Sequence, residues 1–202
     1  MTRLTKKRIM AISGTTLCGC SVGILQDSAL GLDPFSCFVT GIANIFGSSY
    51  GTFYLIVTSI LLLVVIFLKR SYLGYTTLAN LLLTGIIADY TLAFLNGFVK
   101  APTYLIRIIL LLSRLGLMCL AASLYFTAAL GVSAYDAIAL ISADRYRALP
   151  FKYHRVITDG FCVTIGLIFG ATVGIGTLIT AFFMGPMIQW FNNHVSEPLL
   201  RW

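Results

Sequence analysis

A short motif occurs twice in this chain, 100 residues apart, and this repeat constrains the fold more than any other feature. Ser28-Ala-Leu-Gly-Leu-Asp-Pro-Phe35 is echoed by Ala128-Ala-Leu-Gly-Val-Ser-Ala-Tyr135, with Ala-Leu-Gly identical. At the same offset, Gly74-x-x-Thr77-Leu78 recurs as Gly174-x-x-Thr177-Leu178. Two blocks in one ungapped register predict a duplicated unit with a break at the same place in each copy.

The apolar runs between these motifs place the chain in a membrane. Hydrophobic residues make up 58% of the sequence and charged residues only 10%, far from the globular norm of roughly a quarter charged. The net charge of +7 could suggest a nucleic-acid partner, but most Lys and Arg residues stand at the ends of apolar runs. That placement is typical of membrane orientation signals, so no nucleic-acid partner is expected.

The N-terminal segment has two interpretations. A basic start, residues 2–8, followed by an apolar stretch resembles a signal peptide, and Leu17-Cys-Gly-Cys20 resembles a lipoprotein cleavage box. The apolar stretch continues to Leu30, however, about 20 residues, which is enough to cross a ~30 Å hydrocarbon core. We therefore expect a retained first span, with Gly19-x-x-x-Gly23 as a close helix-packing face.

The sequence predicts an all-α polytopic membrane protein with six transmembrane helices. The segments that follow the two breaks, 34–45 and 134–144, would cover only about 18 Å as helices, too short to cross. The six predicted spans are 9–30, 52–68, 72–98, 103–130, 156–170 and 173–191. Together they form a single membrane domain, 1–202, with repeat 1 at about 9–98 and repeat 2 at about 103–191.

Charge placement favours six spans over eight. With a cytoplasmic N-terminus and six spans, the inner loops hold Lys69-Arg70 and the basic stretch from Arg145 to Arg155, whereas the outer loops hold only Lys100. Each half then has three spans, an odd number, so the second copy is inserted upside down. Inverted repeats with broken helices are a common transporter architecture.

The two motifs resemble the pattern of the YczE/YitT-like family of bacterial integral membrane proteins. The first half carries Leu30-Gly-Leu-Asp-Pro-Phe-Ser36 and the second Leu130-Gly-Val-Ser-Ala-Tyr-Asp136. The chain closes with Val173-Gly-Ile-Gly-Thr-Leu178 and Met184-Gly-Pro186. The chain departs from the pattern at Ser36, where an Asp is expected. The resemblance implies a multi-pass protein of the bacterial cytoplasmic (inner) membrane, here with both termini cytoplasmic.

Charged groups within the predicted spans are the first candidates for function, because each costs about 3 kcal/mol to insert and needs a partner or a wet cavity. Arg107 lies at the depth of Asp27 and Asp89, so an interhelix ion pair is expected there. Arg114 lies about 15 Å below the outer surface of the membrane, near the midplane, and no predicted span carries an acidic residue at that depth. Its expected partner is a broken segment, a backbone carbonyl or a ligand.

The acids near the two breaks have open roles. Asp33 before Pro34 is expected to cap the short helix, because an Asp accepts bonds from free backbone amides at that position. Asp136 lies inside its segment and is a candidate for a proton- or cation-linked role. Asp159 is placed either to pair with Arg155 at (i, i+4) or to act in transport. Ser36 and Tyr135 complete the predicted set around the breaks.

Enzyme chemistry is not expected. The chain has no GxSxG, HExxH or phosphate-binding Gly-Lys motif, and its five cysteines lack the CxxC spacing of a metal or redox site. His154, placed in a solvated basic loop, has no neighbouring ligand set. We therefore expect neither a metal nor a cofactor.

Two functions fit these features. The first is a small secondary transporter for an anionic or zwitterionic solute, bound by Arg114 with Asp136, Asp33, Ser36 and Tyr135, while Asp89, Arg107, Asp27 and Asp159 pair or couple ions. The second is a non-transporting accessory protein whose 145–155 loop docks a partner or anionic lipid. The expected partners are the bilayer, a small solute, and a second copy or another protein.

Overall fold

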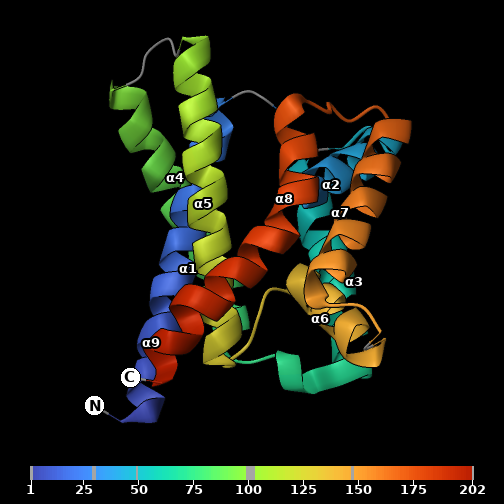
Figure 1. Ribbon diagram of the computed structural model, residues 1–202. Coiled ribbons are helices and arrows are strands. Elements are labelled where there is room, and N and C mark those ends of the chain that lie inside the picture. Colours follow the sequence, from blue (N-terminus) through green and yellow to red (C-terminus); the bar gives the residue numbers. More distant parts are fainter. Residues whose placement is uncertain (1, 29–30, 49, 99–102, 147, 202) are drawn as a thin grey trace. The chain divides into compact units, whose positions relative to one another are not determined.

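The structure is a computed structural model that describes residues 2–28, 31–48, 50–98, 103–146 and 148–201 (Figure 1). The side chains at 25–28, 85, 89, 92, 95, 96 and 98 lie outside what it describes, among them Asp27 and Asp89. The described part is helical and contains no strand. Its elements are α1 (Arg3–Ser28), α2 (Pro34–Ile45), α3 (Tyr50–Lys69), the 3-10 turn η1 (Arg70–Tyr72), α4 (Tyr75–Phe98), α5 (Tyr104–Ala128), α6 (Ala134–Arg145), α7 (Phe151–Ile168), α8 (Ile175–Phe191), the π-helical turn η2 (Asn192–Ser196) and α9 (Glu197–Arg201).

The order of helices repeats at the offset predicted from the motifs. The short helices α2 and α6 both have 12 residues and begin 100 residues apart. The pairs α1 and α5, α3 and α7, and α4 and α8 begin 100 or 101 residues apart. The duplication seen in the sequence is therefore also a duplication of helix order.

The chain divides into two compact units that cut across this duplication. Unit 1 comprises Met1–Ala29, Ser71–Ser133 and Met187–Trp202, and unit 2 comprises Leu30–Arg70 and Ala134–Pro186. Unit 1 therefore contains α1 and α4 from the first half of the chain and α5 from the second half. The chain passes from unit 2 to unit 1 within α8, next to Pro186, the proline inside that helix.

In unit 1, α1 packs against both α5 and α4 (Figure 1). Its neighbours in α5 run backwards along the chain: an added Cβ at Gly14 would meet Ala121 and Tyr125, whereas Cys18 Sγ lies 3.7 Å from Met118 Sδ. Met10 and Ala11, earlier in α1, pack in one cluster with Leu124 and Ala128, and Ala128 is later in α5 than any neighbour of Gly14. The helices α1 and α5 are therefore antiparallel.

The packing of α1 on α4 runs the other way. A Cβ at Gly19 would lie 2.6 Å from the Cβ of Ile87, and one at Gly23 would lie 2.6 Å from the carbonyl oxygen of Ala88 and 2.7 Å from Thr91 Cβ. Later residues of α1 thus meet later residues of α4, so the two helices are parallel. Both glycines lie where only a hydrogen fits, and the predicted Gly19-x-x-x-Gly23 packing face is confirmed.

Each repeated Leu-Gly motif packs against the Gly-x-x-Thr motif of the other half of the chain. In unit 1, a Cβ on Gly131 would lie 2.7 Å from both Gly74 N and Thr77 Oγ1. In unit 2, a Cβ on Gly31 would lie 2.6 Å from Thr177 Oγ1 and 2.8 Å from Gly174 N. Both junction glycines have nearly the same positive φ, 118° at Gly31 and 119° at Gly131.

The threonine in each junction holds its turn by hydrogen bonds. Gly74 N donates to Thr77 Oγ1 at 3.2 Å, and Gly174 N donates to Thr177 Oγ1 at 3.2 Å. The Thr77 hydroxyl also donates to the carbonyl of Val132 at 2.8 Å. Because a hydroxyl can accept and donate at once, Thr77 ties the start of α4 to the chain that follows Gly131.

Unit 2 contains two short hairpins built from α2 with α3 and from α6 with α7. Asp33 caps α2 as predicted, since its carboxylate accepts the Ser36 amide at 3.1 Å and Pro34 opens the helix. The two hairpins meet where α2 crosses α7, and there a Cβ on Gly41 would lie 2.8 Å from Gly166 Cα. A backbone approach this close needs glycine on both helices.

One prediction about the second half is wrong. The stretch from Arg145 to Arg155 was predicted to be a solvated basic loop, with the fifth span starting at residue 156. Instead α7 begins at Phe151 after Pro150 as its N-cap, and both His154 and Arg155 are buried. Pro150 cannot continue a preceding helix but is well placed to start one, so the helix begins five residues earlier than its apolar pattern suggests.

Candidate functional site

Four polar side chains from α6 and α7 meet inside unit 2. Tyr135 and Asp136 lie in the first turn of α6, and Arg155 and Asp159 lie one turn apart in α7. The exposed fractions of Arg155, Asp136 and Asp159 are 3%, 4% and 0%. Charged residues are almost never this deeply buried unless they are paired, so the contacts among them decide what the cluster can do.

Arg155 is held by both acids. Its Nη1 donates to Asp136 Oδ1, and its Nε donates to Asp159 Oδ2 at 3.2 Å. The second of these bonds is the (i, i+4) pair that the sequence offered as one of two roles for Asp159. The Tyr135 hydroxyl donates to the other oxygen of Asp159 at 2.5 Å, and the Arg155 guanidinium carbon lies 4.6 Å from the centre of the Tyr135 ring. We call Tyr135, Asp136, Arg155 and Asp159 the Arg155 network.

The formal charge of the Arg155 network does not balance. One guanidinium faces two carboxylates, so the network carries a charge of −1 when both acids are ionised. Burying a net charge away from water is costly. Both carboxylates are bonded to Arg155, so side chains of the network itself engage its guanidinium.

An aromatic contact joins the Arg155 network to the break before α2. The Phe35 and Tyr135 rings stack with their centres 4.8 Å apart. Phe35 stands between Asp33 and Ser36, and the Ser36 hydroxyl donates to Asp33 Oδ1 at 2.8 Å. The Ser36 hydroxyl also lies 3.0 Å from the hydroxyl of Tyr50 in α3. Both breaks thus contribute polar groups to unit 2.

Five of the nine predicted site residues belong to unit 2. Unit 2 holds Asp33, Ser36, Tyr135, Asp136 and Asp159. Arg107 and Arg114 belong to α5 in unit 1, where Arg114 is 3% exposed. The predicted partners of Arg107 are Asp27 and Asp89, whose side chains lie outside the described residues. The pairing of Arg107 and the substrate-binding role of Arg114 stay predictions.

Sequence reasoning named Arg155 only as a possible partner of Asp159 and missed its burial at the centre of the cluster. It was grouped with a basic loop because four other basic residues precede it within ten positions. One signal could have placed Arg155 inside a helix: Pro150 marks a helix start. The burial of His154 was missed for the same reason. Its Nδ1 lies 2.9 Å from Ser142 Oγ, and its Nε2 lies 3.1 Å from the carbonyl oxygen of Tyr146.

The described side chains offer no obvious metal centre. No three His, Cys, Asp or Glu side chains in that part of the chain gather closely enough to hold a metal ion. All five cysteines are free thiols, and four of them, Cys18, Cys37, Cys119 and Cys162, are buried. These four therefore lie among packed side chains. The chemistry open to the Arg155 network is therefore that of two carboxylates, a guanidinium and a phenol.

Comparison with known proteins places the chain in a family without giving an activity. It is 23% identical over 187 residues to an uncharacterised protein of Bacillus subtilis, YyaS, covering 93% of this chain and 92% of that protein. It is 26% identical over 183 residues to an uncharacterised protein of Haemophilus influenzae, covering 90% and 81%. No solved structure matches the chain. Residues 5–193 match a family of unknown function, DUF6198, and the chain belongs to that family.

Proposed function

We propose that this protein crosses the cytoplasmic membrane of a bacterium six times, with both termini inside the cell. Two helical stretches of the described chain, Tyr50–Tyr72 and Tyr104–Ala128, are long and apolar enough to cross, with mean hydropathies of 2.6 and 2.1. Only 11% of the first is buried by the rest of the protein. An apolar helix left that bare in water would be a large exposed hydrophobic patch, whereas lipid would cover it.

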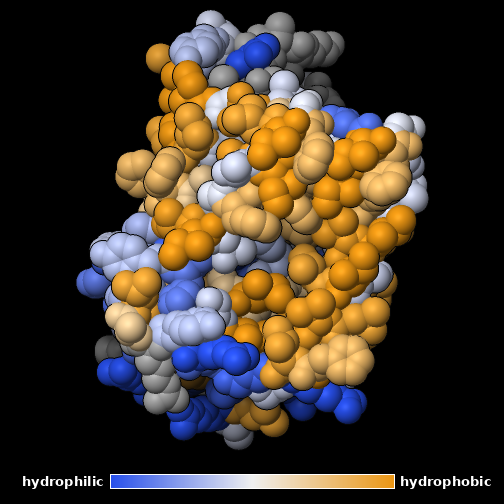
Figure 2. Space-filling model, turned by 90° about the vertical axis from the view of Figure 1, so that its right-hand side faces the viewer, coloured by the Kyte–Doolittle hydropathy of each residue, from blue (hydrophilic) through white to orange (hydrophobic). Residues whose placement is uncertain are grey.

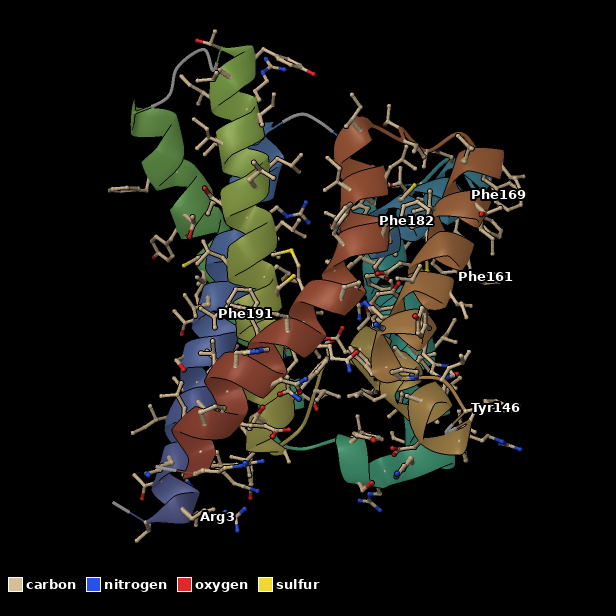
Figure 3. All side chains as sticks on the ribbon, viewed as in Figure 1. Arg3, Tyr146, Phe161, Phe169, Phe182 and Phe191 are labelled. Carbon is tan, nitrogen blue, oxygen red and sulfur yellow. The ribbon has the colours of Figure 1, made fainter. Side chains whose placement is uncertain are left out.

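The apolar surface is not confined to these two stretches. The face shown in Figure 2 is mostly hydrophobic. In unit 2, the rings of Phe161, Phe169 and Phe182 are 63%, 42% and 61% exposed (Figure 3). These residues lie on α7, at its end and on α8, the helices that correspond to the fifth and sixth predicted spans. Their exposure supports contact with lipid there too.

Helix direction supports three spans in each half. Because α1 and α4 are parallel, the chain between them must cross the membrane a net odd number of times. If α3 crosses and the 12-residue α2 does not, this condition is met, whereas crossing by both would make α1 and α4 antiparallel. The antiparallel packing of α1 and α5, the first helices of the two halves, supports inverted repeats.

The membrane topology can be tested by labelling from one side. With six spans, Lys69 faces the cytoplasm and Lys100 the outside. Cysteines introduced singly at these positions, in a background whose five native cysteines are replaced, should react with an impermeant maleimide from opposite sides of sealed vesicles. Labelling of both from the same side would exclude the proposed topology.

We further propose that the protein is a secondary transporter in which the Arg155 network takes up a proton or cation. The observation that carries this proposal is the burial of the Arg155 guanidinium with two carboxylates, one of which, Asp136, lies on the short helix α6 next to a chain break. In membrane proteins, ionisable residues inside the bundle mark ion pathways and proton relays. A proton or cation taken up by the network would offset its formal charge of −1, so its arrival or loss would change the attraction between α6 and α7.

The transported solute is proposed to be small and anionic or zwitterionic, with Arg114 as the residue that binds its carboxylate. Arg114 is buried near the middle of the 25-residue helix α5. A guanidinium binds a carboxylate through two parallel hydrogen bonds, which gives both affinity and orientation. The proposal thus separates solute binding, at Arg114, from coupling, at the Arg155 network.

Uptake by proteoliposomes separates these two roles. The purified protein would be offered a panel of radiolabelled amino acids and dicarboxylates with and without an inward proton gradient. For a solute that is taken up, Arg114→Gln should abolish uptake, whereas Asp159→Asn should retain exchange at equal pH but lose acceleration by the gradient. Lys69→Gln, which removes an exposed cation of unit 2, is the control and should behave as wild type.

Other outcomes would exclude the transporter. If no member of the panel is taken up or raises the melting temperature of the protein, the proposal fails for this class of solute, because a ligand that binds only the folded state must stabilise it. If the gradient still accelerates uptake by Asp159→Asn, the Arg155 network is not the coupling site. A thermal scan of each variant identifies any loss caused by unfolding.

The alternative is an accessory protein that docks a partner through residues 145–155. It has fewer exposed basic side chains to support it than the sequence suggested. Arg155 and His154 are buried, so Arg145 and Lys152 are the described basic side chains left to meet a partner. The alternative predicts that Arg145→Gln with Lys152→Gln impairs function more than Arg114→Gln does. The transporter proposal predicts the reverse order.

A further inference from the structure

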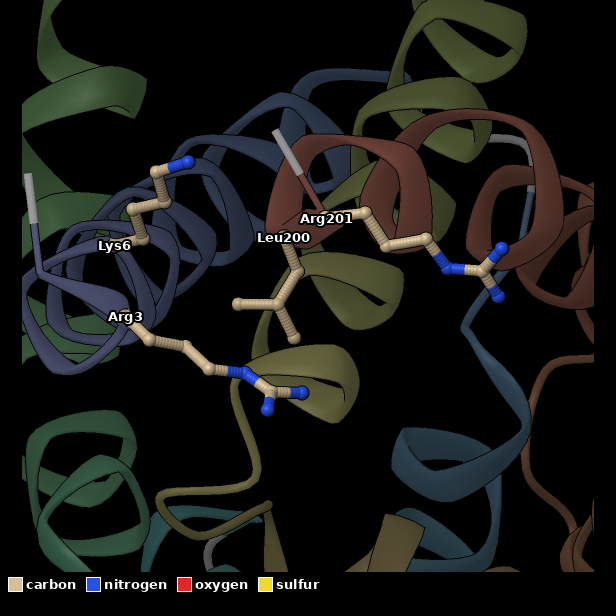
Figure 4. A pocket seen from close by; sticks show the side chains of 4 residues that line it. All are labelled: Arg3, Lys6, Leu200 and Arg201. Atoms are coloured by element: carbon tan, nitrogen blue, oxygen red, sulfur yellow. The ribbon is translucent and has the colours of Figure 1, made fainter.

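A cleft in unit 1 brings the two ends of the described chain together. It has a volume of about 380 Å³ and is lined by Arg3 and Lys6 from the start of α1 and by Leu200 and Arg201 from α9 (Figure 4). Figure 4 shows Leu200 between Arg201 and the two cationic side chains of α1, Arg3 and Lys6. The volume is within the range of small-molecule sites, and the lining combines positive charge with one apolar side chain.

The cleft carries excess positive charge. Glu197 accepts a bond from Arg201 at 3.0 Å and so offsets one of the three cations. Neither Arg3 nor Lys6 forms an ion pair within the described residues, and the first turn of α1 contains no acidic residue. Two positive charges therefore remain for a ligand to neutralise.

The position of these charges on α1 strengthens the case for an anion. The start of a helix carries a partial positive charge from its free N–H groups, which favours acids and disfavours bases there. In α1, Arg3, Lys6, Lys7 and Arg8 all lie in the first six residues of the helix. This arrangement opposes the helix dipole, and an anion bound in the cleft would relieve both the dipole and the repulsion among the cations.

Exposed apolar side chains on the two helices that line the cleft narrow the choice of anion. On α1, Leu4, Ile9 and Ile12 are 52%, 52% and 66% exposed, and on α9 Leu199 is 52% exposed. A free inorganic anion would use none of this surface. An amphiphile with an anionic head and hydrocarbon chains would place its head among the cations and its chains along α1.

We propose that this cleft binds the phosphate headgroup of an anionic phospholipid. The inference rests on the proposed membrane location but not on transport, and it lies wholly within unit 1. With both termini at the cytoplasmic face, the cleft is at the depth of the inner-leaflet headgroups. Arg3 and Lys6 bind the phosphate, and Leu200 contacts the first carbons of the acyl chains.

The test uses the full chain in a neutral detergent. Its binding of dioleoylphosphatidylglycerol and dioleoylphosphatidylcholine would be compared by native mass spectrometry and by thermal shift, with inorganic phosphate as a third arm. We expect tighter binding of the glycerol lipid, weakened about fivefold for each cation removed in Arg3→Gln, Lys6→Gln and the double variant. The matched control is Lys69→Gln with Arg70→Gln, which removes two charges from the end of α3 and should change binding little.

Each other result overturns a defined part of the inference. Equal binding of the two lipids by the wild type would exclude an anion site. A loss as large in the control as in the double variant would mean a general surface charge and no site. Stabilisation by phosphate equal to that by the glycerol lipid would exclude the lipid as the specific ligand. Release of the chain from membranes by alkaline carbonate would instead refute the membrane location, and so separates that failure from the others.

Discussion

Replacing Gly131 with alanine should destabilise the protein strongly, and the structure gives the reasons. An alanine at φ 119° is in a region that L side chains rarely adopt, which costs on the order of 1–3 kcal/mol. Its Cβ would also lie 2.7 Å from Gly74 N and from Thr77 Oγ1, and relieving this contact costs roughly 1–3 kcal/mol more. The neighbours are a backbone atom and a hydroxyl engaged in two hydrogen bonds, so neither can move without a further loss.

The sum, about 2–6 kcal/mol, should lower the melting temperature by roughly 5–20 °C, since 1 kcal/mol shifts a protein of 150–250 residues by about 2–4 °C. The assay is a thermal scan of the purified protein in detergent. The control is Gly116→Ala in α5, where an added Cβ meets nothing within 4 Å. Since glycine in a helix interior is about 1 kcal/mol less favourable than alanine, this control should raise the melting temperature.

The same substitution at Gly31 extends the test to the other junction. Gly31→Ala should lower the melting temperature about as much as Gly131→Ala, because its φ and its distances to Thr177 and Gly174 are nearly the same. If Gly131→Ala left the melting temperature within 2 °C of wild type, or if only one of the two junction variants were destabilised, the reciprocal packing of the two motifs would be refuted.

Three further predictions concern unit 2 and use the same thermal scan. Gly166→Ala should be strongly destabilising because the new Cβ would lie 2.5 Å from both the carbonyl oxygen and the Sγ of Cys37; wild-type stability would refute the close crossing of α2 on α7. Tyr135→Phe should destabilise by about 1–3 kcal/mol, since buried Asp159 loses a hydrogen-bond donor, and an unchanged melting temperature would mean that this bond is absent. Lys69→Gln should change stability by less than about 1 kcal/mol because its ion pair is exposed, so a large loss would contradict that exposure.

Local sequence patterns were enough to predict several features that the structure contains. The echo of one motif predicted that helix order repeats, and α2 and α6 begin 100 residues apart. Asp33 before Pro34 predicted the cap of α2, and the spacing of Arg155 and Asp159 offered their pairing as one of two roles for Asp159. Each of these depends on residues within about four positions of one another, or on a direct comparison of two stretches of sequence.

The burial of Arg155 could not be predicted in the same way. A charged residue beside a basic stretch is usually solvated. The ion pair with Asp136 on α6 helps to offset the desolvation cost of burying Arg155. Asp136 is 19 residues away from Arg155, in a different helix. The Arg155 network therefore depends on the packing of α6 against α7, and the local charge pattern of the sequence does not predict that packing.

The sequence by itself determined that the chain is duplicated, apolar and broken at the same point in each half, because repetition and hydropathy are properties of the order of residues. Only the tertiary structure decided that each break packs against the other half's Gly-x-x-Thr motif, Gly31 on Gly174 and Gly131 on Gly74. The reason is physical: close approach of two backbones requires a glycine on each side, but a glycine does not specify which distant glycine it will meet. That choice is made by the packing of whole helices, which joins α1 to both α4 and α5.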